Sequence, residues 1–275
     1  MSKLVWDAVA ERFYQTGCSH GVLYKQVNGA YPAGVVWNGL TAVSENPEGA
    51  DPTDIYADDI KYLSIRSAEN YKATIEALYS PEEFDECDGS AALTTGVTIS
   101  QQPRKAFGFT WQTIKGNGTE LNDYGKVIHI IYGATVSPSE KSHSTVNDSP
   151  DVMNLSWEID TIPVNVTGHK PTAHLQIDCT KLTAAQVTAV EKTLYGSDAV
   201  TAAAATYKKA SGTFQATGVD YYTLNGTTYT KVQSPSSDDF ADYYVVDTPA
   251  VEAAEATTAY LPLPDALLAI IQAAA

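Results

Sequence analysis

The clearest strand pattern in the chain is the stretch Asn154-Leu155-Ser156-Trp157-Glu158-Ile159-Asp160. Apolar residues recur at every second position, with no helical phase. Because successive side chains of a β-strand point to opposite faces, this pattern predicts a strand with one face in a core and one face in water. Trp157 and Ile159 are expected to point inward, and Glu158 and Asp160 outward.

The same alternation returns further along the chain, where Leu175, Ile177 and Cys179 are the inward residues and Gln176 and Asp178 are outward. Asn-Gly pairs punctuate neighbouring apolar runs and are typical of tight hairpin turns. Further strands are predicted at 60–65, 73–79, 96–99, 106–113 and 126–136. The sequence therefore predicts a mainly β protein.

A single amphipathic helix is predicted at residues 183–195. Thr183 is a suitable N-cap, Gln186 completes a capping box, and Gly196 is a typical stop. The composition changes after this helix, so we expect three parts: residues 1–196 containing this helix, residues 197–260 with a Tyr-rich hairpin, and a C-terminal segment at 261–275. The last segment is apolar and should pack on the core or on a neighbour, with Asp265 as the N-cap of a short helix.

The charge balance limits the classes of partner. The 275 residues include 17 Lys and Arg against 33 Asp and Glu, a net charge of −16. Tight nucleic-acid binding depends on basic side chains that neutralise phosphates, so this chain is not expected to grip nucleic acid. Residues 1–13 lack the order of a secretory signal, no apolar run is long enough to span a membrane, and three unpaired cysteines are typical of a cytoplasmic product.

No sequence motif for acyl, phosphoryl, metal or dinucleotide chemistry is present, so we expect no enzyme, no metal and no cofactor. Among five histidines, only His169 and His174 lie close in sequence. Their odd separation places them on opposite faces of a strand, which argues against joint metal coordination. Paired carboxylates are abundant, so a glycoside hydrolase stays as an alternative.

Residues 45–59 are predicted to form a long acidic loop, because Pro47 and Pro52 disfavour helix and ladder pairing. A loop of this length is either a solvated connection or a functional segment. Its candidate functional residues are Glu45, Glu48, Asp51, Asp54 and Asp58.

An ordered series of short stretches resembles the major tail tube proteins of long-tailed, siphovirus-type bacteriophages of Gram-positive hosts. The stretches are Trp37–Glu45, Gly49-Ala50, Ile55–Leu63, Ala73–Ala77, Pro81–Gly89, Gly96–Gln102, Ile130–Ala134, Pro138–Ser142, Asn147–Pro150, Thr161–Val164 and Leu261–Asp265. The resemblance implies a tail-tube β-sandwich or barrel with one flanking helix. Residues 197–260, with a Tyr-rich hairpin, depart from the family and form an inserted hairpin-rich segment.

The resemblance also implies a function. Subunits of this family form hexameric rings that stack into the tail tube, a conduit for genomic DNA during ejection. The partners would be further copies of the chain, the tape measure protein, the tail terminator and tail tip proteins, and transiently DNA. The protein would be made in the bacterial cytoplasm and reside in the virion tail.

Within that tube, the candidate lumen-facing residues are Glu158, Asp160, Gln176 and Asp178, whose polar side chains would repel duplex phosphates. The acidic loop would contact a neighbouring subunit or ring. A polar outer surface is the alternative for the four strand residues. A second function class, a carbohydrate-binding or adhesin module of a phage tail, is favoured if tyrosines of the 221–229 hairpin face solvent.

Overall fold

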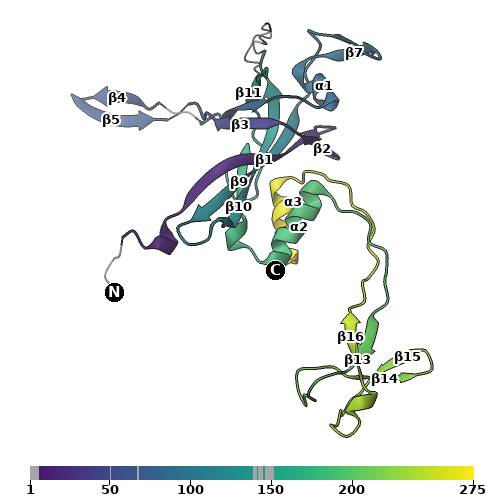
Figure 1. Ribbon diagram of the computed structural model, residues 1–275. Helices are drawn as coiled ribbons and strands as arrows, with labels where there is room; N and C mark the ends of the chain where they lie inside the picture. The colour runs from purple at the N-terminus through teal and green to yellow at the C-terminus, as the bar shows by residue number, and fades with distance from the viewer. Residues whose placement is uncertain (1–5, 50, 67, 139–140, 142–144, 146–151) are drawn as a thin grey trace. The chain divides into compact units, whose positions relative to one another are not determined.

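The computed structural model describes residues 6–49, 51–66, 68–138, 141, 145 and 152–275, and it confirms a mainly β fold (Figure 1). The strands are β1 (Tyr14–Lys25), β2 (Gly34–Trp37), β3 (Leu40–Glu45), β4 (Thr53–Ala57), β5 (Ile60–Ile65), β6 (Lys72–Ala77), β7 (Ala91–Thr94), β8 (Val97–Ile99), β9 (Phe107–Asn117), β10 (Leu121–Val136), β11 (Leu155–Thr161), β12 (His174–Asp178), β13 (Thr206–Lys209), β14 (Tyr222–Asn225), β15 (Thr228–Lys231) and β16 (Tyr244–Thr248). The helices are α1 (Asp85–Asp88), α2 (Ala184–Tyr195) and α3 (Pro264–Ala273), with short 3-10 turns η1 (Val9–Glu11), η2 (Glu82–Phe84), η3 (Cys179–Lys181) and η4 (Phe240–Asp242). Over these described residues, none of the helices has the length and apolar character needed to cross a bilayer.

The chain divides into two compact units. The first consists of Met1–Gly196 with Thr258–Ala275, and the second of Ser197–Thr257. The division falls at residue 196, where the sequence places it, and at residue 257 rather than 260. The second unit is therefore an insertion between α2 and the C-terminal segment.

One antiparallel sheet of eight strands organises the first unit: seven follow the order β2-β1-β9-β10-β11-β6-β3, and the eighth, β12, pairs with β10 off this path. The long strand β10 pairs with β9 along one edge and shares its other edge between two partners. Residues 127–131 pair with β12, and residues 134–136 pair with β11. The switch occurs at Gly133, which has φ 59° and whose Cβ, if present, would lie 2.3 Å from the carbonyl oxygen of Ile162. Only glycine fits this position without strain.

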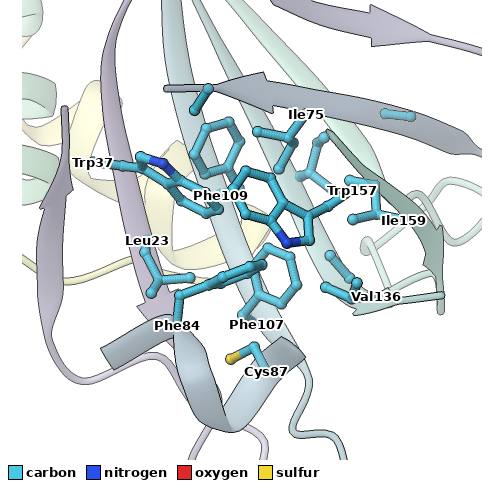
Figure 2. Close-up of a cluster of buried hydrophobic side chains, with 14 of the residues drawn as sticks. Leu23, Trp37, Ile75, Phe84, Cys87, Phe107, Phe109, Val136, Trp157 and Ile159 are labelled. Carbon is cyan, nitrogen blue, oxygen red and sulfur yellow. The ribbon is translucent and has the colours of Figure 1, made fainter. Parts of the chain in front are cut away.

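The sheet curls so that its two ends meet around an aromatic core. Trp37 belongs to β2 at one edge, and Trp157 belongs to β11 near the other edge, yet their ring centroids lie 5.3 Å apart. Phe84 of η2 closes this core, with ring centroids 4.4 Å from Trp37 and 5.3 Å from Trp157 (Figure 2). As predicted, Trp157 and Ile159 are buried. The layers expected for a β-sandwich are therefore formed by a single curled sheet.

A second core lies on the other face of β1, β9, β10 and β12, beneath α2 and α3. Val190 and Leu194 of α2 are buried there, and the capping box of Thr183 and Gln186 forms as the sequence predicts. The C-terminal segment packs on this core, because Leu261 forms a bridge with Tyr31 and Leu267 of α3 is buried.

The predicted helix cap at Asp265 is wrong. Leu263 occupies the N-cap position of α3, and its side chain cannot accept a capping hydrogen bond. The carboxylate of Asp265 instead accepts hydrogen bonds from the backbone N–H and the hydroxyl of Thr167, at 3.1 and 2.7 Å. Asp265 therefore ties α3 to a distant loop, and Pro264 at the first helical position starts the helix.

The second unit contains a four-stranded antiparallel sheet in the order β13-β16-β14-β15. The predicted hairpin forms between β14 and β15, but its two turn residues are Gly226 and Thr227, because Asn225 ends β14 and pairs with Thr228. Tyr221 and Tyr243 are buried against Phe214 and Phe240. The entering and leaving segments run side by side and pair at Ser197 with Thr257, among other bridges.

The packing of the aromatic core indicates how much stability is lost when Trp37 is replaced. Trp37→Ala should lower the free energy of unfolding by about 3–5 kcal/mol, because it empties the contact between the sheet ends. The measurement is urea unfolding followed by fluorescence. Val36→Ala is the matched control, because Val36 lies on the same strand but is 65% exposed. This variant should change the free energy of unfolding by less than about 0.5 kcal/mol. Equal effects of the two changes would contradict this view of the core.

The insertion predicts that the first unit folds alone. Residues 198–256 can be replaced by Asn-Gly, because the backbones of Ser197 and Thr257 already pair through hydrogen bonds of 3.0 and 2.9 Å. The shortened chain should keep the near-ultraviolet circular dichroism of its core and change its Tm by less than about 5 °C. Loss of cooperative unfolding would show that the core depends on the insertion.

Candidate functional site

The predicted acidic loop is only partly a loop, and the exclusion of ladder pairing there is wrong. Residues from Thr53 onward form β4, which pairs with β5 to make a two-stranded hairpin. Asp58 and Asp59 make the turn, with φ of 50° and 60°. Aspartate tolerates this left-handed region, and both prolines precede the strand, so neither obstructs pairing.

One face of the hairpin is aliphatic. Ile55 pairs with Leu63, and Ile65 lies on the same face by register. Tyr56 pairs with Lys61 on the other, more polar face, and Tyr62 is the extra residue of a bulge between these two pairs. These side chains are strongly exposed, with Tyr56 at 67% and Tyr62 at 66%. An isolated two-stranded hairpin is marginally stable in water, and exposed apolar patches mark interaction sites.

The five acidic residues assigned to the loop do not form one cluster. Asp54 forms an ion pair with Lys61 and accepts a hydrogen bond from Ser64, both at 2.7 Å. These two contacts hold the pKa of Asp54 below its usual range. Glu48 pairs with Lys72 at 2.7 Å. Asp51 and Asp58 are exposed, and Glu45 ends β3 beside two histidines.

The four candidate lumen residues do not share one surface. Glu158 and Asp160 lie on the face of β11 opposite the buried Trp157, which belongs to the core inside the curl. Gln176 and Asp178 lie on the face of β12 opposite Ile177, which belongs to the core beneath the helices. The two pairs therefore occupy opposite faces of the sheet, because β11 and β12 bury opposite sides against different cores.

Asp178 is committed to local structure. Its carboxylate forms an ion pair with Lys115 and accepts hydrogen bonds from the backbone N–H and hydroxyl of Thr180, at 3.1 and 2.6 Å. Burial acts to raise the pKa of Asp178, but these hydrogen bonds outweigh it and the net shift is downward. Asp178 therefore caps η3, and its negative charge is paired with Lys115.

Glu158 and Asp160 belong to a polar sheet face formed by β11, β6 and β3. Across the ladder, Glu158 pairs with Thr74, and Asp160 pairs with Lys72. Side-chain hydrogen bonds cross this face, including Asn70 to Asp160 at 2.7 Å and Asn154 to Glu76 at 2.9 Å. The face thus combines an acidic excess with a fixed hydrogen-bond pattern.

One cluster was missed by sequence reasoning. His129 of β10 and His174 of β12 lie on the same face, with Glu45 opposite them. Each histidine Nδ1 lies 3.7 Å from a carboxylate oxygen of Glu45. Trp111 stacks on His129 and Tyr71 on His174, with centroids 4.8 and 4.7 Å apart. No spacing in the sequence signals this cluster, because it depends on the pairing of β10 with β12.

Burial lowers the pKa of both histidines to about 4, so both imidazoles are neutral at pH 7. Burial and the nearby Glu45 together raise the pKa of Tyr71 well above its usual value.

No protein-family model matches this chain, and no curated protein matches it at a significant level. Functional inference therefore depends on the chain's own surfaces: the exposed hairpin, the polar sheet face and the tyrosines of the second unit.

The Lys115–Asp178 pair gives a testable stability prediction. Both side chains are mostly buried, at 15% and 23% exposure, so Lys115→Met should cost about 1–3 kcal/mol by leaving the Asp178 carboxylate without its cation. Lys72→Met breaks a more exposed, solvent-screened pair and should cost clearly less. Urea unfolding of both variants checks the difference, and a neutral Lys115→Met would contradict it.

Proposed function

We propose that this chain is a structural subunit that assembles with copies of itself into stacked hexameric rings, forming the tail tube of a long-tailed bacteriophage. The observation that carries the proposal is the β4–β5 hairpin, which exposes an aliphatic face together with the rings of Tyr56 and Tyr62. The ordered sequence resemblance to major tail tube proteins includes this same segment.

The hairpin suits contact with another copy of the chain. Ile55, Leu63 and Ile65 offer an aliphatic face, and the exposed rings of Tyr56 and Tyr62 add aromatic area. A second subunit that covers both faces would remove this apolar area from water, which stabilises association by roughly 25 cal/mol per Å². The same chain exposes further apolar residues, such as Val36 at its sheet edge, that could receive such a contact.

The polar face of β11, β6 and β3 is the surface that suits a channel. It carries Glu158, Asp160 and Glu76 against one cation, Lys72. Six copies would carry a formal charge of 6 × −16 = −96. An acidic lining repels duplex phosphates, so DNA can pass without being held. In this proposal, Gln176 and Asp178 do not line the channel.

The same proposal sets the partners and the place of action. Tape measure protein would fill the tube before ejection, terminator and tip proteins would bind its ends, and genomic DNA would pass through it. The protein would act as a virion structural component of the tail and not as an enzyme, after synthesis in the bacterial cytoplasm.

A second candidate function has one observation in its favour. Four half-buried tyrosines, Tyr207, Tyr222, Tyr229 and Tyr244, contact one another across the sheet of the second unit, with Tyr207 and Tyr229 stacked at 4.1 Å. Aromatic rings with polar tips are suited to recognition surfaces. A glycan-binding or adhesin role for this unit is compatible with a tube-forming core.

The test of assembly is electron microscopy of the purified protein at high concentration, with and without preformed tail tips. We expect rings or tubes with a central hole. The double variant Tyr56→Asp/Tyr62→Asp should remain folded, because both side chains are exposed, but should abolish assembly by placing charges at the contact.

Leu224→Asp is the matched control, since Leu224 is an exposed strand residue of the second unit. It should assemble as the unaltered protein does. Normal tubes from the tyrosine double variant would exclude the hairpin as the contact, and a persistent monomer that binds polysaccharide would favour the adhesin function.

A further inference from the structure

Unpartnered polar atoms are concentrated in the cluster of Glu45, His129 and His174. Over the described residues, five buried side-chain nitrogens or oxygens lack a hydrogen-bond partner, and three of them belong here: His129 Nδ1, His174 Nε2 and the Tyr71 hydroxyl. Native proteins seldom leave such atoms unsatisfied, and each case needs an explanation such as a bound ion or water. His129 is only 3% exposed, so bulk water does not reach it freely.

The protonation of His129 can be assigned from its surroundings. Its Nε2 lies 3.0 Å from the hydroxyl oxygen of Thr113, and this hydroxyl lies 3.4 Å from Gln15 Oε1. The tautomer that satisfies both contacts carries its proton on Nε2 and donates it to Thr113, whose hydroxyl then donates to Gln15. This leaves a lone pair on Nδ1, which faces the carboxylate of Glu45. The lone pair of His129 Nδ1 and the carboxylate of Glu45 then face each other with no proton between them to make a hydrogen bond.

We propose that Glu45, His129 and His174 bind a zinc ion. Two imidazoles with one carboxylate form an established zinc ligand set, and the Thr113 contact supplies the outer hydrogen bond that orients a ligating histidine. Both histidines are held neutral by burial, as metal ligands must be. The Tyr71 hydroxyl or a water completes the coordination.

The distances fit this assignment after small side-chain rotations. The ligand atoms of the three residues all lie within 4.8 Å of one another, and both contacts with Glu45 are 3.7 Å. Tetrahedral zinc with bonds of about 2.1 Å places neighbouring ligand atoms about 3.4 Å apart.

The ion would act as a cross-link across the curled sheet. Glu45 ends β3, whereas His129 and His174 lie on β10 and β12. A cavity of about 800 Å³, lined in part by Tyr71 and His174, gives access from solvent. Glu45 is also the last residue of its strand before the chain continues to the β4–β5 hairpin, so the ion would fix the start of that connection. This inference does not depend on tube assembly.

The test is zinc binding by the full chain after removal of metal with EDTA. We expect one zinc per chain by elemental analysis, a Tm raised by about 5–10 °C at saturating zinc, and visible absorption typical of tetrahedral Co²⁺ when cobalt replaces zinc. Glu45→Gln and His174→Asn should each weaken zinc affinity at least about tenfold, and should lose the cobalt absorption.

Glu48→Gln and His169→Asn are the matched controls, because both residues are exposed and lie outside the cluster. They should bind zinc as the unaltered protein does. If the chain takes up no zinc, or if zinc binding survives both Glu45→Gln and His174→Asn, the ion belongs elsewhere or is absent and the proposal is overturned. Glu45 ends a strand and is partly exposed, so its variant is expected to fold.

Discussion

The contact that closes the sheet on itself is the packing of Trp37 against Trp157, with Phe84 between the two sheet ends. Without it, the eight strands would form an open layer with one face covered by helices and the other wet. Closure instead gives the sheet an interior, and this interior determines which side of each strand is buried. The buried side of each strand in turn determines where each candidate surface lies on the sheet.

The division of β10 between two partners has an equally wide effect. Its first part pairs with β12, which buries Ile177 beneath the helices, and its last part pairs with β11, which buries Trp157 inside the curl. Two strands with the same sequence pattern therefore face opposite ways. The bulge at Gly133 makes the change of partner possible, because the backbone there approaches Ile162 too closely for any side chain.

The parts of the fold that could be predicted are those set by local chemistry. The helix from Ala184 to Tyr195 follows from its cap and its stop, and the strand at 155–161 follows from its alternation. Orientation could not be predicted, because alternation identifies a polar face but not the core that the opposite face meets. Asp178, for example, lies opposite the buried Ile177 as the alternation predicts, yet its carboxylate is paired with Lys115. The second strand of the hairpin, at 60–65, was predicted, but the first, at 53–57, was missed because its acidic residues resemble a solvated loop. The histidine cluster was missed because it depends on pairing between separate strands.

The insertion of the second unit bears on how such a chain can diverge. Its entering and leaving backbones pair directly, between α2 and the C-terminal segment, and it contributes no strand to the large sheet. Natural variation in its length or composition would leave the strand order and both cores of the first unit unchanged. The molecule thus separates a constrained scaffold from a region that is free to evolve, and sequence change in a lineage of such proteins should accumulate between residues 197 and 257.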